Sequence, residues 1–445
     1  MPRTLIKHAT VINDGSSKVM DVLIDNQRII QIAASISANS HDIIVDAAGK
    51  YLLPGMIDDQ VHFREPGLTH KGTIASESRA AVAGGITSYM EMPNVNPATT
   101  NIDALERKFD IANKYSYGNY SFYLGDTETN LEQIKRLNPS QHCGVKVFMG
   151  ASTGNLLVEN PSALEGIFKN APTLIVTHCE SGPIIQRNTD KLLKLKTELS
   201  IADHPAIRDQ NACFESSSYA VSLAKKYNSQ LHVLHITTEK ELSLFEAGPI
   251  ENKTITAEAC VHHLWFSNDD YKKSGNLIKC NPSIKYQSDR DALIQALHTG
   301  HIDIVATDHA PHTWDEKILA YPQAPAGLPL VQHALLSLLD HVAHKRLNLE
   351  LVVEKIAHNP AKRYGITDRG FIREGYFADL VLINFNKSTQ ATHKSSLYHC
   401  GWTPFDGHEF SSKIEATWVN GQLVFDGEKI QKHPPNASRL SFNKH

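Results

Sequence analysis

The 445-residue sequence lacks several features that mark whole classes of protein. No apolar run approaches the roughly 18 residues of a membrane-spanning helix, and the start of the chain has no apolar core of the signal-peptide kind. Lysine and arginine (44) nearly balance aspartate and glutamate (48), so a formal charge of -4 provides no basic surface for nucleic acid. These absences predict a cytoplasmic protein with no membrane or nucleic-acid partner, which acts on a small molecule.

Cysteine is scarce and widely spaced. The six cysteines include no C-x-x-C pair, which favours reduced, buried thiols over a disulfide framework or a four-cysteine zinc site. No G-x-G-x-x-G follows the first strand-like run of the middle section, which argues against a doubly wound dinucleotide-binding sheet. Histidine, in contrast, is plentiful, with 24 residues.

The middle of the chain alternates between strand-like and helix-like patterns. The apolar or β-branched runs lie at 57–62, 86–92, 119–124, 144–149, 173–178, 231–235, 254–259 and 302–308. Predicted helices lie at 72–84, 101–114, 129–137, 160–170, 205–227, 238–247, 288–299, 328–345 and 349–364. Eight strand–helix repeats predict an α/β fold, a (β/α)8 TIM barrel, with the doubly wound open sheet as the alternative.

Both ends of the chain have a residue pattern different from that of the middle. Short strand-like runs separated by turn residues fill residues 1–54, and similar runs return near 378–383 and 416–425. This pattern predicts a small β-sandwich domain built from residues 1–54 and 366–445, around a catalytic barrel at 55–365. The last 15 residues or so are predicted to be a solvated tail.

Ionisable residues interrupt the apolar runs near their ends. They are His62, Lys146, His178, His235 and Asp308. Burying a lone lysine or aspartate costs several kcal/mol unless it is paired or bound to a metal, and chemistry in such barrels lies at the C-terminal ends of the strands. Any one of these histidines alone is typical of a satisfied core residue, but together the five predict a metal centre.

Lys146 and Arg64 call for separate explanations. Desolvation lowers the pKa of a buried amine, and a neutral Lys146 amine could add carbon dioxide to give a carbamate that bridges two cations. The alternative for Lys146 is a salt bridge with a neighbouring carboxylate. Gln60, His62 and Arg64 would face one side of an extended strand, where the guanidinium could hold a substrate carboxylate.

Several motifs resemble those of the dihydroorotases of the cyclic amidohydrolase superfamily. They occur in family order at residues 58–67, 80–87, 91–97, 144–148, 177–180, 234–238, 281–283 and 306–312. The first and third of these, which contain Arg64 and Asn94, distinguish the chain from hydantoinases and allantoinases. The chain departs from the family pattern H-x-H at Gln60, whose amide oxygen binds zinc less tightly than imidazole.

The resemblance implies an active site in detail. It implies one or two zinc ions, held by His62, Lys146 as a carbamate of carbon dioxide, His178, His235 and Asp308, with Gln60 as a weak candidate ligand. Asp308 would also carry the proton during catalysis. The implied contacts to the carboxylate and ring of the substrate are Arg64, Asn94, His312, Asn281, Ala326 and Gly327.

The implied reaction is the reversible, zinc-dependent cyclisation of N-carbamoyl-L-aspartate to L-dihydroorotate in pyrimidine (UMP) biosynthesis. A hydantoinase- or allantoinase-like amidohydrolase and a catalytically weakened assembly partner are the alternatives, and a homodimer or higher oligomer is left open. We expect His262 and His263 to be structural or surface residues rather than ligands. Residues 310–327 are predicted to form a long loop over the site, either a lid or static.

Overall fold

The computed structural model describes residues 2–150, 156–158 and 160–443 and contains a parallel barrel. Its strands are β6 (Met56–Val61), β7 (Ile86–Glu91), β8 (Asn119–Phe122), β9 (Leu124–Gly125), β10 (Val145–Gly150), β11 (Ile175–Glu180), β12 (Leu231–Val233), β13 (Ile255–Cys260) and β14 (Ile304–Ala306). They pair in parallel, and a bridge between Val61 and His309 joins the last strand region to the first. The predicted barrel is confirmed, with the third strand divided at Tyr123.

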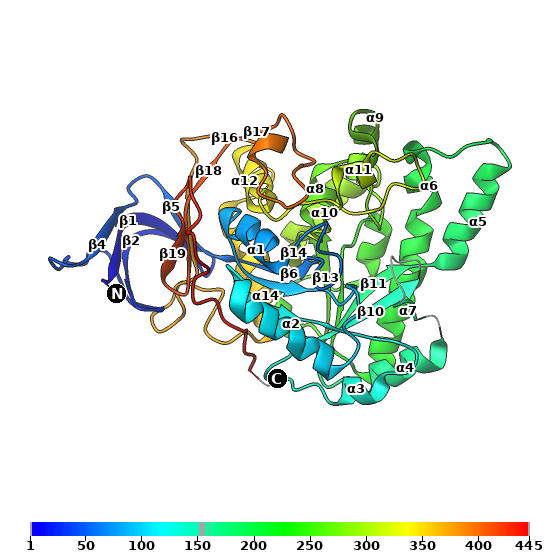
Figure 1. The fold of residues 1–445 in the computed structure, drawn as a ribbon, viewed down its shortest axis with the longest axis horizontal. Coiled ribbons are helices and arrows are strands. Elements are labelled where there is room, and N and C mark those ends of the chain that lie inside the picture. The colour runs from blue at the N-terminus through cyan, green and yellow to red at the C-terminus, as the bar shows by residue number, and fades with distance from the viewer. Residues whose placement is uncertain (1, 151–155, 159, 444–445) are drawn as a thin grey trace.

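Helices follow the strands and cover the barrel, as Figure 1 shows. They are α1 (Ile74–Ala83), α2 (Ile102–Tyr115), α3 (Leu131–Lys135), α4 (Pro161–Asn170), α5 (Gly182–Leu193), α6 (His204–Ile207), α7 (Gln210–Tyr227), α8 (Val261–Trp265), α9 (Tyr271–Ser274), α10 (Gln287–Thr299), α11 (Trp314–Lys317), α12 (Ala334–Ala343), α13 (Leu349–Val353) and α14 (Asn359–Tyr364). Among the described residues, no helix combines the length and apolar character needed to cross a bilayer.

The helices differ from the predictions in three places. The helix expected at 238–247 is only a short 3-10 helix, Glu239–Leu244. Helix α5, in which only Ile184 is buried, was not predicted. The helix expected at 205–227 is divided into α6 and α7. The Asp209 side chain accepts hydrogen bonds from the backbone N–H groups of Asn211 and Ala212, so a new helix begins after Asp209.

Strands from both ends of the chain form a second, separate sheet. It contains β1 (Thr4–Asn13), β2 (Ser16–Asp25), β3 (Arg28–Ala33), β4 (Ile43–Asp46), β5 (Tyr51–Pro54), β15 (Leu380–Asn384), β18 (Lys413–Val419) and β19 (Gln422–Phe425). Antiparallel pairing of β5 with β15 joins the N-terminal and C-terminal strands, and Figure 1 shows the blue and red strands side by side. This confirms a sheet domain assembled from both termini, whereas its boundaries at 54/55 and 365/366 stay a prediction.

The C-terminal segment is not the solvated tail that the sequence predicted. The Leu440 N–H donates to the Tyr120 carbonyl at 2.9 Å, and the Tyr120 N–H donates to the Ser438 carbonyl at 3.1 Å. Leu440 and Phe442 are only 1% and 5% exposed. The two apolar side chains are separated by one residue, as in an extended segment that buries one face, and this pattern is too short to identify without knowledge of the partner.

We therefore expect the tail to stabilise the fold. Leu440→Ala should lower the free energy of unfolding by roughly 2–5 kcal/mol, the usual cost of truncating a buried leucine. Denaturant unfolding measured by circular dichroism would test this. Leu195→Ala, at a leucine that is 76% exposed, should change stability by no more than about 0.5 kcal/mol. Equal stability of the Leu440→Ala and unchanged proteins would contradict a docked tail.

Candidate active site

A small cavity opens at the C-terminal ends of the barrel strands. It is lined by almost every residue that the sequence singled out, namely Gln60, His62, Arg64, Asn94, Lys146, His178, His235, Asn281, Asp308, Ala326 and Gly327. His312 lies directly behind, with its Nε2 atom 3.2 Å from Arg64 Nη2 and 3.0 Å from the Ala326 carbonyl. The barrel thus gathers residues separated by up to 267 positions in the chain, from Gln60 to Gly327, at one point.

Two imidazoles converge on one side of the cavity. His178 is in β11 and His235 follows β12, and His178 Nδ1 lies 2.9 Å from His235 Nε2. On its other side, His178 Nε2 is 3.4 Å from Glu180, which is paired with Arg208. Burial, then the nearby His178 and Lys146, lower the pKa of His235 well below its usual value. Two imidazoles whose ring nitrogens lie this close together are suited to bind one cation.

The Glu180 carboxylate orients His178. Burial alone would raise the pKa of Glu180, but the charge of Arg208 and the contact with His178 outweigh burial and lower that pKa to about 2. A carboxylate behind a ligating histidine fixes the orientation of the ring and the position of its proton. The sequence analysis missed this role, although Glu180 stands only two residues after His178 on the same strand.

The opposite side of the cavity is occupied by His62 and Asp308. His62 Nε2 and Gln60 Nε2 each lie 3.1 Å from Asp308 Oδ1, and His62 Nδ1 lies 2.6 Å from Asn94 Oδ1. Burial opposes ionisation of Asp308, but the hydrogen bond from His62 and its charge outweigh burial and lower the pKa of Asp308. Gln60 therefore directs the nitrogen end of its amide at Asp308.

Lys146 reaches the cavity from the interior of β10. The residue is 1% exposed, and its Nζ atom lies 4.8 Å from the centre of the Phe148 ring. Within the described chain Lys146 has no ion pair, so the salt bridge considered from the sequence is absent there. Burial lowers the pKa of the amine to about 8, against the weaker opposing effect of Asp308 and Glu258. About a tenth of such an amine is neutral at pH 7, against well under a thousandth of an ordinary lysine.

Arg64 is a second buried cation at the cavity. It is 6% exposed, and burial lowers the pKa of its guanidinium to about 10. Its Nε donates to the Pro311 carbonyl at 3.1 Å and Nη2 contacts His312, so among the described residues no carboxylate pairs with it. Burial lowers the pKa of His312 to about 3, so its imidazole is neutral. The site therefore offers an uncompensated positive charge to a ligand.

Two buried side chains outside the cavity hold its rim in place. Lys317 is 1% exposed and donates to the carbonyls of Lys279, Pro325 and Gly327 at 2.9–3.1 Å. Trp402 Nε1 donates to the His312 carbonyl at 2.8 Å, and the two residues are 90 positions apart in the sequence. Neither role can be predicted from the sequence, because each depends on a backbone carbonyl distant in the chain. Lys317 anchors part of the loop at 310–327.

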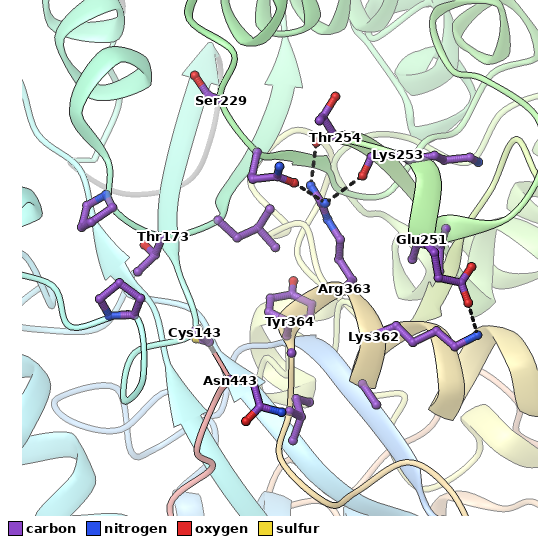
Figure 2. A pocket seen from close by; sticks show the side chains of 18 of the residues that line it. Cys143, Thr173, Ser229, Glu251, Lys253, Thr254, Lys362, Arg363, Tyr364 and Asn443 are labelled. Atoms are coloured by element: carbon purple, nitrogen blue, oxygen red, sulfur yellow. Dashed lines mark hydrogen bonds and ion pairs between the residues drawn. The ribbon is translucent and has the colours of Figure 1, made fainter. Parts of the chain in front are cut away.

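A larger cavity of about 1050 Å³ lies at the opposite, N-terminal ends of the strands. Figure 2 shows Arg363 at its centre, donating to the carbonyls of Lys253 and Thr254, and Lys362 paired with Glu251. Lys362 is thus paired within the protein, and Arg363 makes several hydrogen bonds to oxygens, although its Nε atom has no partner among the described residues. Because barrel enzymes of this kind carry their chemistry at the C-terminal face, the smaller cavity is the candidate active site.

Comparison with known proteins identifies the family. Residues 51–424 match the model of the amidohydrolase family. A dihydroorotase from Halobacterium salinarum is 33% identical over 94% of this chain and 96% of its own length. Another, from Methanosphaera stadtmanae, is 30% identical over 97% of this chain and 99% of its own length.

Solved structures share the fold. An L-hydantoinase (dihydropyrimidinase) from Arthrobacter aurescens superposes with a TM-score of 0.93 at 24% identity, covering 100% of both chains. A D-hydantoinase from Thermus sp. gives a TM-score of 0.89 at 22% identity, over 99% of this chain and 100% of that one. At these identities the likeness concerns the fold alone. The chain belongs to the amidohydrolase family, together with the dihydroorotases that it matches along nearly its whole length.

Proposed function

We propose that this protein is a dihydroorotase, which interconverts N-carbamoyl-L-aspartate and L-dihydroorotate in pyrimidine biosynthesis. The observation that carries the proposal is the buried Arg64 guanidinium, which has no carboxylate partner in the described chain and lies beside a cluster of metal-ligand residues. Both compounds carry a carboxylate that an arginine fork can bind. Relatives named dihydroorotase, at 30% identity or more, support the same substrate.

We assign the metal ligands from the chemistry of the donor set. His178 and His235 would hold one cation, His62 and Asp308 the other, and a Lys146 carbamate formed from carbon dioxide would bridge them. The adjacent imidazoles of His178 and His235 and the unpaired, buried amine fit this assignment. Zinc bound there would supply an acidic water and polarise the attacked carbonyl. Gln60, whose nitrogen end faces Asp308, would support that carboxylate as a donor rather than bind zinc tightly.

Asp308 is our candidate for proton transfer. Both of its hydrogen bonds, from His62 and from Gln60, reach Oδ1. Oδ2 would therefore accept the proton from the attacking water and deliver it to the ring nitrogen as the amide bond breaks. In the direction of ring closure the same oxygen would remove a proton from the ureido nitrogen.

Substrate orientation would depend on the other side of the cavity. Arg64, Asn94 and His312 would bind the carboxylate, while Asn281 and the backbone at Ala326 and Gly327 would contact the ring. Lys317 and Trp402 hold this rim rigid, which would keep the ring near the attacking water. A hydantoin lacks the carboxylate and would leave Arg64 uncompensated, so a hydantoinase activity fits this site less well. A cytoplasmic location and a homodimer or higher oligomer stay predictions of the sequence.

Replacing Arg64 tests the carboxylate contact. Arg64→Met keeps an apolar stem and removes the charge. Because a hydrogen bond to a charged group contributes about 1.5–3 kcal/mol, KM for dihydroorotate should rise by roughly 10- to 100-fold. Steady-state kinetics would measure KM and kcat separately, and kcat should change less. Arg187→Met, at an exposed position of α5, is the control. An unchanged KM in Arg64→Met would remove Arg64 from substrate binding.

Asp308→Asn tests the proton carrier. An amide cannot accept the proton, so kcat should fall by about 10²- to 10⁴-fold, the usual contribution of a positioned general acid–base. Substrate affinity, measured by titration calorimetry, should fall far less because Arg64 is unchanged. Metal content must be measured alongside, since Asp308 is also a proposed ligand. A variant that retained both its metal and its kcat would refute the assignment.

The Lys146 amine predicts a pH dependence of site assembly. Only the neutral amine can attack carbon dioxide, and the pKa of Lys146 is lowered to about 8. At constant dissolved carbon dioxide, reactivation of metal-depleted, decarboxylated protein by zinc should therefore become faster as pH rises from 7 to 8 and level off above about 8. Lys146→Met should not be reactivated at any pH. A rate independent of pH over this range would argue against carbamate formation.

A further inference from the structure

A second group of ligand-type side chains lies at the end of the seventh barrel strand. Cys260 ends β13, and His262 and His263 are in the short helix α8 that follows. One ligand atom from each of the three lies within 4.8 Å of the other two. Their exposed fractions are 0%, 1% and 4%. Of the two alternatives expected from the sequence, a structural or a surface position, burial leaves the structural one for both histidines.

The two imidazoles lack the hydrogen bonds that buried ring nitrogens normally make. Neither ring nitrogen of His262 has a partner within hydrogen-bond geometry among the described residues, although the Thr307 carbonyl lies nearby. His263 Nε2 is 3.1 Å from the Pro282 carbonyl, and its Nδ1 has no partner in the same part of the chain. Unsatisfied buried polar atoms are rare and indicate a missing partner.

The arrangement of His263 is typical of a metal ligand. A neutral imidazole has one N–H and one lone pair. The Nε2–H donates to the Pro282 carbonyl, so the lone pair is on Nδ1, the atom without a partner. Histidines that bind metal usually donate their other N–H to a carbonyl or a carboxylate in this way. Burial keeps both rings neutral, and it lowers the pKa of His262 to about 4.

A neighbouring cluster shows the contrast. Asp59, His232 and Glu258 also lie within 4.8 Å of one another and are fully buried. There, however, His232 Nε2 lies 3.4 Å from the Asp59 carboxylate and 3.5 Å from the Glu258 carboxylate. The Tyr364 hydroxyl donates to Asp59 at 2.8 Å. That cluster balances its own charges. His262 and His263 have no carboxylate partner among the described residues, although Cys260 Sγ contacts Glu258 Oε1 at 3.4 Å.

Gln60 faces the sulfur of this cluster. Its Oε1 atom is 3.6 Å from Cys260 Sγ. For tetrahedral zinc, bonds of ~2.3 Å to sulfur and ~2.1 Å to oxygen place those two ligands about 3.6 Å apart. The Cys260 thiol donates a hydrogen bond to Gln60 Oε1 across this distance, and the same separation would suit two ligands on one zinc ion. The opposite end of the same amide contacts Asp308.

We propose that Cys260, His262 and His263 form a sulfur-containing zinc site, with the Gln60 amide oxygen at its fourth position. Cys260, His262 and His263 are not among the proposed catalytic ligands, and Gln60 lies between the two sites. The assignment of the sulfur-containing site does not depend on the proposed function. A cation there would polarise the Gln60 amide, which would strengthen its N–H donation to Asp308. The site would thus connect a buried structural metal to the proposed proton carrier.

Cobalt substitution of the full-length protein tests the site directly. Co²⁺ bound to a thiolate gives an intense near-ultraviolet charge-transfer absorption, which ligands of nitrogen and oxygen alone do not produce. The unchanged protein loaded with Co²⁺ should show this band. Cys260→Ser should lose it together with about one metal ion per chain by elemental analysis. Cys143→Ser, at a buried cysteine on the N-terminal side of the barrel, should keep both.

The outcomes are distinct and do not rely on enzymatic activity. Absence of the band from the unchanged protein at full cobalt loading would overturn the proposal, with no variant required. Persistence of the band in Cys260→Ser would also overturn it, and loss in Cys280→Ser alone would assign the sulfur to Cys280, whose Sγ is 3.7 Å from His263 Nε2. His262→Asn should lose the band at equimolar cobalt. Dihydroorotate hydrolysis, assayed separately, reports on the proposed function alone.

Discussion

Burial of positive charge without a counter-charge is the constraint on which the active site depends. Some buried lysines of the barrel have carboxylate partners, as in Lys108 with Glu91 at 2.8 Å and Lys253 with Asp303 at 2.6 Å, and Lys317 donates to three backbone carbonyls. Lys146 and Arg64 are equally buried, yet no carboxylate of the described chain pairs with either. A fold that leaves two cations uncompensated in one cavity is prepared for anions from outside. A carbamate on Lys146 and a substrate carboxylate beside Arg64 would supply these negative charges.

The backbone supports the same conclusion. Arg64, His235 and Asp308 have positive φ angles of 74°, 39° and 50°, a region that residues other than glycine rarely adopt. Each stands just beyond a barrel strand, where the chain turns out of the sheet. Such conformations cost of order 1–3 kcal/mol each and persist where surrounding contacts enforce them. Here they turn the three side chains inward to the cavity instead of continuing the alternation of the strand.

Much of the fold and of the cavity lining could be predicted from the sequence, because in a barrel the place of a residue along its strand determines where it lies in space. Strand ends that repeat every 30 residues or so must meet at one rim, so His62, Lys146, His178 and Asp308 were expected together and do line one cavity. Their roles as ligands stay predictions. What the pattern could not give depends on contacts between distant segments, such as Lys317 beneath Gly327, Trp402 behind His312 and Leu440 beside Tyr120.

The two halves of the site differ in how firmly they would hold a cation. His178 and His235 bring two ring nitrogens within 2.9 Å of each other, and Glu180 with Arg208 fixes the first ring from behind. The ring of His62, in contrast, is held between Asp308 and a neutral amide, Asn94, and Gln60 supplies an N–H to Asp308 where the family pattern has an imidazole ligand. A cation on this second side would have fewer strong ligands and would exchange more readily. The substitution at position 60 therefore favours one firmly held ion and a carboxylate stabilised by hydrogen bonds, an arrangement in which Asp308 is restrained even when the second ion is absent.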